Sequence, residues 1–127
     1  MEFINDGPIN TARGHYSQAV VANGFVFVAG QLPVRRDGGG SIPDGVEAQT
    51  REALANVARI LGAAGSSLAS LVNVTIYLTD IENWPAVNRV YSEMLHDHRP
   101  ARTVTVSPQL HFGCLIEIQA IALASEE

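Results

Sequence analysis

The residue with the clearest capacity for chemistry is Glu117, which lies in the most apolar segment of the chain, Leu115–Ile121. The other seven glutamates belong to helix-like, loop or terminal segments. If this segment is a strand, Glu117 and Gln119 share one face because alternate residues point to opposite sides. A carboxyl partly removed from water has a raised pKa and suits acid–base catalysis. The alternative is that Glu117 pairs with an arginine across an interface, and the pattern alone leaves both interpretations open.

Two further residues could act beside such a carboxyl. Arg102 follows Pro100 at the start of a predicted strand. Its planar guanidinium could neutralise a sheet carboxylate, or it could bind a small carboxylate substrate through two parallel hydrogen bonds. Tyr16 begins another predicted strand after His15. Its hydroxyl could remain in water at the strand edge, or it could donate a proton to a substrate.

Other polar patterns carry weaker indications. The tract His96–His98 has poor metal-ligand spacing and is predicted to be a solvated loop. Cys114 is predicted to be a buried small hydrophobic residue, because no histidine lies at a spacing typical of a catalytic pair. Asn88 reads as a solvated helical position. We therefore expect neither a metal nor a cofactor.

Composition excludes several classes of function. All eight basic residues are arginine, so neither a lysine Schiff base nor a Walker A loop is possible. The net charge of −5 disfavours a general nucleic-acid binder. No apolar run approaches the roughly 18 residues that span a bilayer. The start of the chain lacks signal-peptide features and there is one cysteine, so we expect a cytoplasmic protein. The length of 127 residues predicts one domain over residues 1–127.

The hydrophobic pattern predicts five strands and two helices. The strands are Tyr16–Ala22, Phe25–Gly30, Leu71–Thr79, Arg102–Val106 and Cys114–Leu123, and the helices run from Asp44 to about Ala64 and from about Trp84 to Leu95.

Local signals fix several details of these elements. Asn23-Gly24 predicts a tight hairpin between the first two strands. Asp44 is expected to cap the first helix in a capping-box-like pattern, and Gly65 to end it. Alternation places four residues of the third strand on one side: Val72, Val74, Ile76 and Leu78. It directs four residues of the last strand toward the helices: Ile116, Ile118, Ala120 and Ala122.

The element order β-β-α-β-α-β-β predicts an α/β (α+β) protein with one mixed sheet and two helices. Two helices cover only one face of such a sheet. Several apolar residues are then expected on both faces of the sheet or on the uncovered one: Phe25, Phe27, Leu115, Ile121 and Leu123. An exposed apolar face of this size predicts a symmetric homo-oligomer.

Seven segments, in order along nearly the whole chain, together resemble one protein family. They are Gly14–Val20, Phe27–Pro33, Gln49–Asn56, Val74–Asp80, Ala86–Tyr91, Pro100–Thr103 and Ile116–Ala122. The family is that of the Rid proteins, reactive intermediate/imine deaminases that are also known as YjgF-like proteins or L-PSP endoribonucleases. The resemblance implies a chorismate-mutase-like fold. It also implies a homotrimer whose three sheets form a central barrel, with active sites at the subunit interfaces.

The resemblance also assigns roles to residues. It implies that Arg102 binds the substrate carboxylate and that Glu117 positions the hydrolytic water and exchanges protons. Tyr16 lies at the substrate end of the pocket and is counted as catalytic. Gly30 and Asn88 shape the site, and the backbone carbonyl of Val104 contributes to holding the water.

The chain departs from the family pattern at four positions, which bear on substrate choice. Ala29 replaces a frequent serine, Val104 a frequent cysteine, His15 a frequent proline and Gln119 a second acidic residue. The implied activity is hydrolysis of small 2-imino or 2-enamino acids to 2-oxo acids and ammonia. This reaction is chemically simple, because hydrolysis of an electrophilic imine carbon needs only a positioned water molecule and a group that accepts and returns one proton.

Three other functions stay open at this stage. The protein could bind small 2-oxo acids without catalysis, although retaining both Arg102 and Glu117 argues mildly against this. It could be a specialised catabolic deaminase acting on an aminomuconate- or aminoacrylate-like compound. An endoribonuclease is the weakest alternative, because the chain is acidic and lacks a basic aromatic patch.

Overall fold

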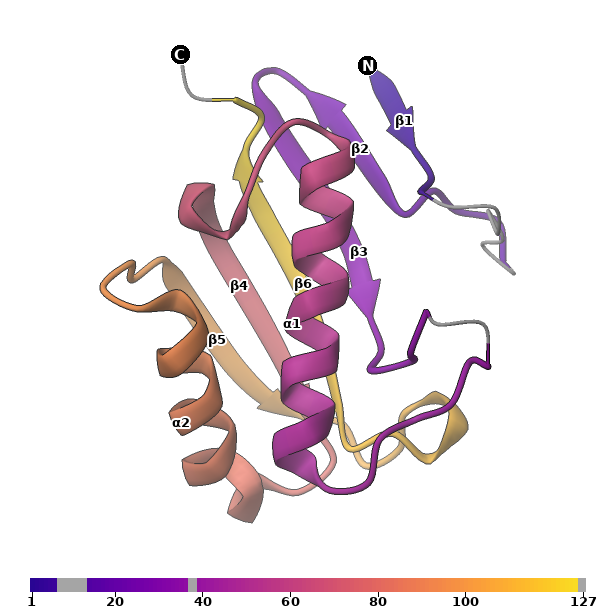
Figure 1. Cartoon of the computed structure of the whole chain (residues 1–127), viewed down its shortest axis with the longest axis vertical. Helices are drawn as coiled ribbons and strands as arrows, with labels where there is room; N and C mark the ends of the chain where they lie inside the picture. The colour runs from indigo at the N-terminus through magenta and orange to yellow at the C-terminus, as the bar shows by residue number, and fades with distance from the viewer. Residues whose placement is uncertain (7–13, 37–38, 126–127) are drawn as a thin grey trace.

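The computed structural model describes residues 1–6, 14–36 and 39–125 and contains one six-stranded mixed sheet. The strand order is β1-β2-β3-β6-β4-β5, and only the β4–β5 pair is parallel. Both helices lie on the same side of the sheet (Figure 1). The predicted mixed α+β fold is therefore confirmed. The elements are β1 (Glu2–Ile4), β2 (Ala19–Ala22), β3 (Phe25–Gln31), α1 (Val46–Ala63), β4 (Leu71–Leu78), α2 (Trp84–Leu95), β5 (Ala101–Val106) and β6 (Ile116–Leu123).

The predicted hairpin between β2 and β3 is confirmed. Ala22 pairs directly with Phe25, and the two intervening residues have left-handed backbone angles, with φ of 52° at Asn23 and 82° at Gly24. This is the turn geometry that matches the natural twist of two antiparallel strands.

The first helix ends as predicted but begins differently. The Gly65 N–H donates to the Gly62 carbonyl at 3.0 Å and the Ser66 N–H to the Leu61 carbonyl at 2.8 Å, a Schellman closure with φ of 80° at Gly65. The expected capping by Asp44 is wrong. Gly45, at φ 87°, is the N-cap residue and no side chain caps the helix, because the glycine conformation turns the chain before the first helical residue.

The N-terminal part of the sheet also differs from prediction. The second strand begins at Ala19, not at Tyr16, because the Tyr16 N–H donates to the Gly14 carbonyl at 3.0 Å in a bend that precedes it. The three-residue strand β1 was not predicted. It pairs antiparallel with β2 and adds one strand at the edge of the sheet.

The core lies between the sheet and the helices. The four residues of β6 that alternation directs inward are at most 2% exposed: Ile116, Ile118, Ala120 and Ala122. The expectation for Val72 is wrong, since it is 40% exposed. Leu71 pairs with Ala122 and Asn73 with Ile121, so Val72 is the extra residue of a β-bulge.

The opposite face of the sheet carries exposed apolar side chains, as predicted. Phe27 is 44% exposed and Leu123 is 40% exposed, and both belong to the central part of the sheet rather than to a loop. Neither helix within the described residues is long and apolar enough to cross a membrane. The open face is the surface on which the prediction of a homo-oligomer rests.

Candidate active site

Glu117 lies on the open face of the sheet, directly against Gly30 of β3. A β-carbon built on Gly30 would lie 2.3 Å from Glu117 Oε2 and 3.0 Å from its Cδ. Val28 pairs with Ala120 and Gln31 with Ile118, so β3 has one extra residue opposite β6 at this point. The bulge and the missing side chain together create the space that the Glu117 carboxyl occupies.

The surroundings of Glu117 alter its proton affinity. Burial raises the pKa of the Glu117 carboxyl above its ordinary value, and the nearby His111 imidazole partly opposes this shift. A raised pKa makes the carboxylate a stronger base than an ordinary carboxylate in water, and so better suited to accept and return a proton. This is the property that acid–base catalysis by Glu117 requires.

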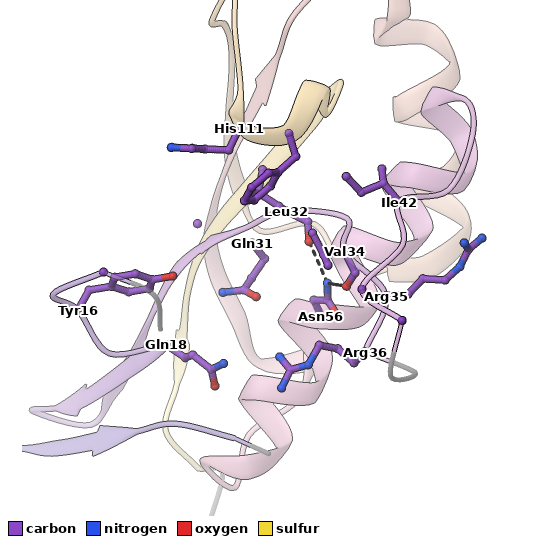
Figure 2. A pocket seen from close by; sticks show the side chains of 15 residues that line it. Tyr16, Gln18, Gln31, Leu32, Val34, Arg35, Arg36, Ile42, Asn56 and His111 are labelled. Atoms are coloured by element: carbon purple, nitrogen blue, oxygen red, sulfur yellow. Dashed lines mark hydrogen bonds between the residues drawn. The ribbon is translucent and has the colours of Figure 1, made fainter. Parts of the chain in front are cut away.

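A pocket of about 920 Å³ is lined in part by Gly30, the residue against which Glu117 lies. Its walls include Tyr16, Gly30, Gln31 and His111 (Figure 2). Tyr16 is 56% exposed, so its hydroxyl is accessible from the pocket. Two predicted site residues, Tyr16 and Gly30, therefore line this pocket, and the third, Glu117, lies against Gly30.

Arg102 lies in a second region, formed by β5 and α2. Its guanidinium carbon is 4.6 Å from the centre of the Trp84 ring and 5.0 Å from that of Tyr91, which is cation–π geometry. Its Nη1 donates to Asn88 Oδ1 at 3.1 Å. Residues Trp84, Asn88 and Tyr91 repeat at helical spacing, so one face of α2 fixes the position of Arg102.

Two predicted site residues accompany Arg102. Asn88 is the hydrogen-bond partner described above, not an isolated solvated residue. Val104 follows two residues later on β5, where its side chain packs against the core and its strand forms the edge of the sheet. The role of its carbonyl in holding water stays a prediction.

Arg102 and Glu117 lie on opposite faces of the sheet. Arg102 is in register with Val74, which is fully buried on the helix side. Glu117 is in register with Tyr77, whose hydroxyl donates to Gln119 at 3.2 Å on the open side. Neighbouring residues in register share a face. The suggested structural pair between Arg102 and Glu117 is therefore wrong within one chain.

Cys114 and the histidine tract have structural surroundings rather than catalytic ones. Cys114 is 1% exposed, and burial and the charge of Glu117 both raise the pKa of its thiol, which keeps it protonated. His98 contacts the Leu71 carbonyl at 2.8 Å from its loop. Within the described ranges, no group of three or more histidine, cysteine or acidic side chains is placed to hold a metal.

Sequence reasoning missed several residues of both regions. Trp84 and Tyr91 were not predicted as site residues, although their spacing around Asn88 could have indicated a shared helix face. His111 was not predicted as a site residue, because its proximity to Glu117 depends on the fold. No signal in the sequence identified Arg36 as a wall of the pocket.

Comparison with known proteins identifies the family. The profile of the family described as Endoribonuclease L-PSP matches residues 8–124 of the chain. The chain belongs to this family. The predicted membership among the Rid or YjgF-like proteins is thereby confirmed.

Curated relatives in this family carry different names. Protein mmf2, mitochondrial, of Schizosaccharomyces pombe is 43% identical over 122 residues, which cover 91% of this chain and 95% of the relative. The 2-iminobutanoate/2-iminopropanoate deaminase of Capra hircus is 38% identical over 120 residues, which cover 94% of this chain and 88% of the relative. The family is therefore shared with named imine deaminases and with proteins whose names state no activity.

Solved structures of this family have the same fold. TdcF of Escherichia coli with bound serine matches with a TM-score of 0.87 and 32% identity, over 97% of this chain and 98% of that one. The YjgF gene product of E. coli matches with a TM-score of 0.84 and 34% identity, over 88% of this chain and 90% of that one. The sheet and both helices of this family member therefore have experimental counterparts.

Proposed function

We propose that this protein hydrolyses small 2-imino acids, with their 2-enamino tautomers, to 2-oxo acids and ammonia. The observation that carries the proposal is the placement of Glu117, a partly desolvated carboxyl held against Gly30, which lines an open pocket. Relatives named imine deaminases support the reaction class. The serine bound to TdcF, like the proposed substrates, carries a carboxylate next to a substituted carbon.

In the proposed reaction, Glu117 acts first as base and then as acid. Water attacks the carbon of the protonated imine, and its proton passes to the Glu117 carboxylate, which gives a neutral carbinolamine group. Glu117 returns the proton to the nitrogen, the C–N bond breaks, and ammonia leaves. The remaining hydroxyl proton goes to ammonia, so the products are a 2-oxo acid and ammonium. No redox step and no covalent bond to the protein is needed.

The proposed site is shared between two copies of the chain. Arg102 binds the substrate carboxylate from one copy, and Glu117 with Tyr16 acts from another, because the two groups lie on opposite faces of one sheet. The uncovered apolar face provides the surface for association, and a closed trimer is the proposed assembly. The arginine is already oriented by Asn88 and two aromatic rings, so little ordering is required on binding.

A coupled assay tests the proposal. An amino-acid oxidase generates the imine, catalase removes peroxide, and semicarbazide competes for the imine that remains. The protein should accelerate 2-oxo acid release, and Glu117→Gln should lower kcat by about 10²- to 10⁴-fold. Glu93→Gln is the matched control, because Glu93 is an exposed helix residue paired with Arg51. If the wild-type protein accelerates hydrolysis of no imine but binds 2-oxo acids, it is a binding protein and the proposal is wrong.

A further inference from the structure

In the single chain, the pocket lined by Gly30 is larger than a three- or four-carbon imino acid requires. Its volume of about 920 Å³ lies near the upper end of ordinary ligand pockets. Figure 2 shows His111 at one end and Arg36 at the other, with Gln31 between them and Tyr16 to one side. The pocket therefore has room for a substrate side chain that extends away from the reacting carbon.

The charge of this pocket is opposite to that of the whole chain. The chain has 13 acidic residues and 8 arginines, and its net charge is −5. Arg35, Arg36 and His111 line the pocket, whereas no aspartate or glutamate does so among the residues that the structure describes. Figure 2 shows that the Arg35 side chain extends away from Tyr16 and that Arg36 reaches toward Gln18. Arg36 is therefore the cation best placed to meet a ligand.

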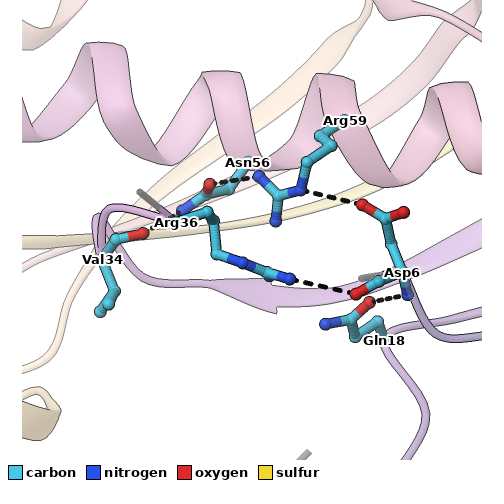
Figure 3. Close-up of polar contacts among 6 residues, drawn as sticks. All are labelled: Asp6, Gln18, Val34, Arg36, Asn56 and Arg59. Carbon is cyan, nitrogen blue, oxygen red and sulfur yellow. Dashed lines mark hydrogen bonds and ion pairs between the residues drawn. The ribbon is translucent and has the colours of Figure 1, made fainter. Parts of the chain in front are cut away.

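A hydrogen-bond network holds Arg36 without neutralising it (Figure 3). Arg36 Nη2 donates to the backbone carbonyl of Asp6 at 3.0 Å, which is an uncharged acceptor. The Asp6 carboxylate instead pairs with Arg59 at 3.0 Å. Within the described part of the chain, Arg36 thus forms no ion pair, whereas Arg59 pairs with Asp6 and is also influenced by the Glu52 carboxylate. Arg59 Nη2 is also buried there without a hydrogen-bond partner.

The two arginines influence each other. Burial lowers the pKa of Arg59, and the neighbouring Arg36 charge adds to that shift. Like charges this close repel, and an anion beside Arg36 would relieve the repulsion. A cation without an ion pair in a concave site is typical of anion recognition.

We infer that the substrates are 2-imino dicarboxylic acids, whose side-chain carboxylate binds Arg36 while the imine carbon lies near Glu117. This inference rests on the proposed function and specifies its substrate class. The Gln18 side chain lies next to Arg36, and its own oxygen already accepts from the Asp6 N–H at 2.6 Å, so the network is rigid on the protein side. Arg36 therefore offers a fixed guanidinium to the side-chain carboxylate of the substrate. The hydrolytic step at the imine carbon is the same as in the proposed function.

The test compares the imines of aspartate and glutamate with those of alanine and leucine, each generated by an oxidase of matching specificity. Wild-type kcat/KM should be at least about tenfold higher for the dicarboxylic imines. Arg36→Gln should lower that value by about 10- to 100-fold and change the neutral imines by less than about twofold. Arg36→Glu should favour the imine of ornithine. Arg51→Gln, which alters an exposed helix arginine, is the control.

A binding measurement keeps the inference testable if a variant loses activity through poor assembly. Titration calorimetry with 2-oxoglutarate and pyruvate should show tighter binding of the dicarboxylate by the wild-type protein. If neutral imines are hydrolysed equally well, or if Arg36→Gln affects both classes alike, the inference is wrong and the proposed function stands. If wild-type protein hydrolyses no imine of either class, the proposed function fails first.

Discussion

The Glu117 region and the Arg102 region are prepared for chemistry in different physical ways. Glu117 is held by close approach to a glycine in a bulged strand, and burial raises its pKa. Arg102 is exposed, and two aromatic rings with one amide fix its direction while water still reaches it. A reactive carboxyl gains from desolvation, whereas a permanent cation needs orientation more than burial. The two arrangements lie on opposite faces of one sheet, and in the proposed function they are the two halves of a site shared between copies of the chain.

The largest expected effect comes from recombining the two halves. Arg102→Ala and Glu117→Ala should each abolish deaminase activity alone. Co-produced at equal levels, they should restore about one quarter of wild-type activity, because each shared site draws its two residues from two independently chosen copies. Assay of the purified mixture measures this value. Mixtures that stay as inactive as the single variants would contradict a site shared between subunits.

Gly30→Ala should displace the Glu117 carboxylate and leave the position of Arg102 unchanged. The added β-carbon would lie 2.3 Å from Glu117 Oε2, so the flexible carboxylate must move. A displacement of about 1 Å lowers kcat by about 10²-fold, with little change in KM. Steady-state kinetics check this. Gly62→Ala is the control, since a β-carbon there meets nothing within 4 Å and should leave activity unchanged.

Asn88→Ala should loosen the Arg102 half and produce the reverse kinetic pattern. Loss of the 3.1 Å hydrogen bond removes one restraint on the guanidinium but leaves both ring contacts. We expect KM to rise by about three- to tenfold while kcat is nearly unchanged. Ser92→Ala, one turn further along α2, should leave both values unchanged. A fall in kcat at constant KM would place Asn88 in the chemical step.

The smallest effect concerns stability. Because the folded-state pKa of Glu117 is raised, its contribution to stability is fully present below the unfolded carboxyl pKa of about 4.3 and is lost as pH rises through the folded-state pKa. Glu117→Gln removes this loss. The variant should melt a few degrees higher than wild type at pH 7, and the difference should shrink below about pH 4. A lower melting temperature at pH 7 would contradict desolvation as the cause, and Glu93→Gln should show no gain.

The sequence predicts the elements of the fold to different degrees. Strong local signals were sufficient for the Asn23-Gly24 turn, for helix α2 and for the inward face of β6, because each follows from propensity and period. The Val72 bulge and strand β1 were not predictable in this way, since both depend on the register of a partner strand. Asp44 failed as a cap because the conformation of Gly45 took precedence.

The same division applies to the candidate site. Glu117 could be singled out because a lone acid in an apolar strand is unusual. The contacts between Arg102 and the aromatic rings join residues distant in sequence, and a local pattern does not contain them. The separation of Arg102 from Glu117 required the register of the parallel β4–β5 pair, which alternation alone cannot supply.

The position of Arg102 beside Trp84 has a consequence for the fluorescence of the protein. Trp84 is the single tryptophan of the chain, and its ring lies 4.6 Å from the Arg102 guanidinium. Indole emission responds to a charge at this range, and no second indole contributes background. A carboxylate that docks on Arg102 therefore changes the fluorescence of the unlabelled protein. Binding at Arg102 can be followed by Trp84 fluorescence in every variant that retains Trp84, including catalytically inactive ones.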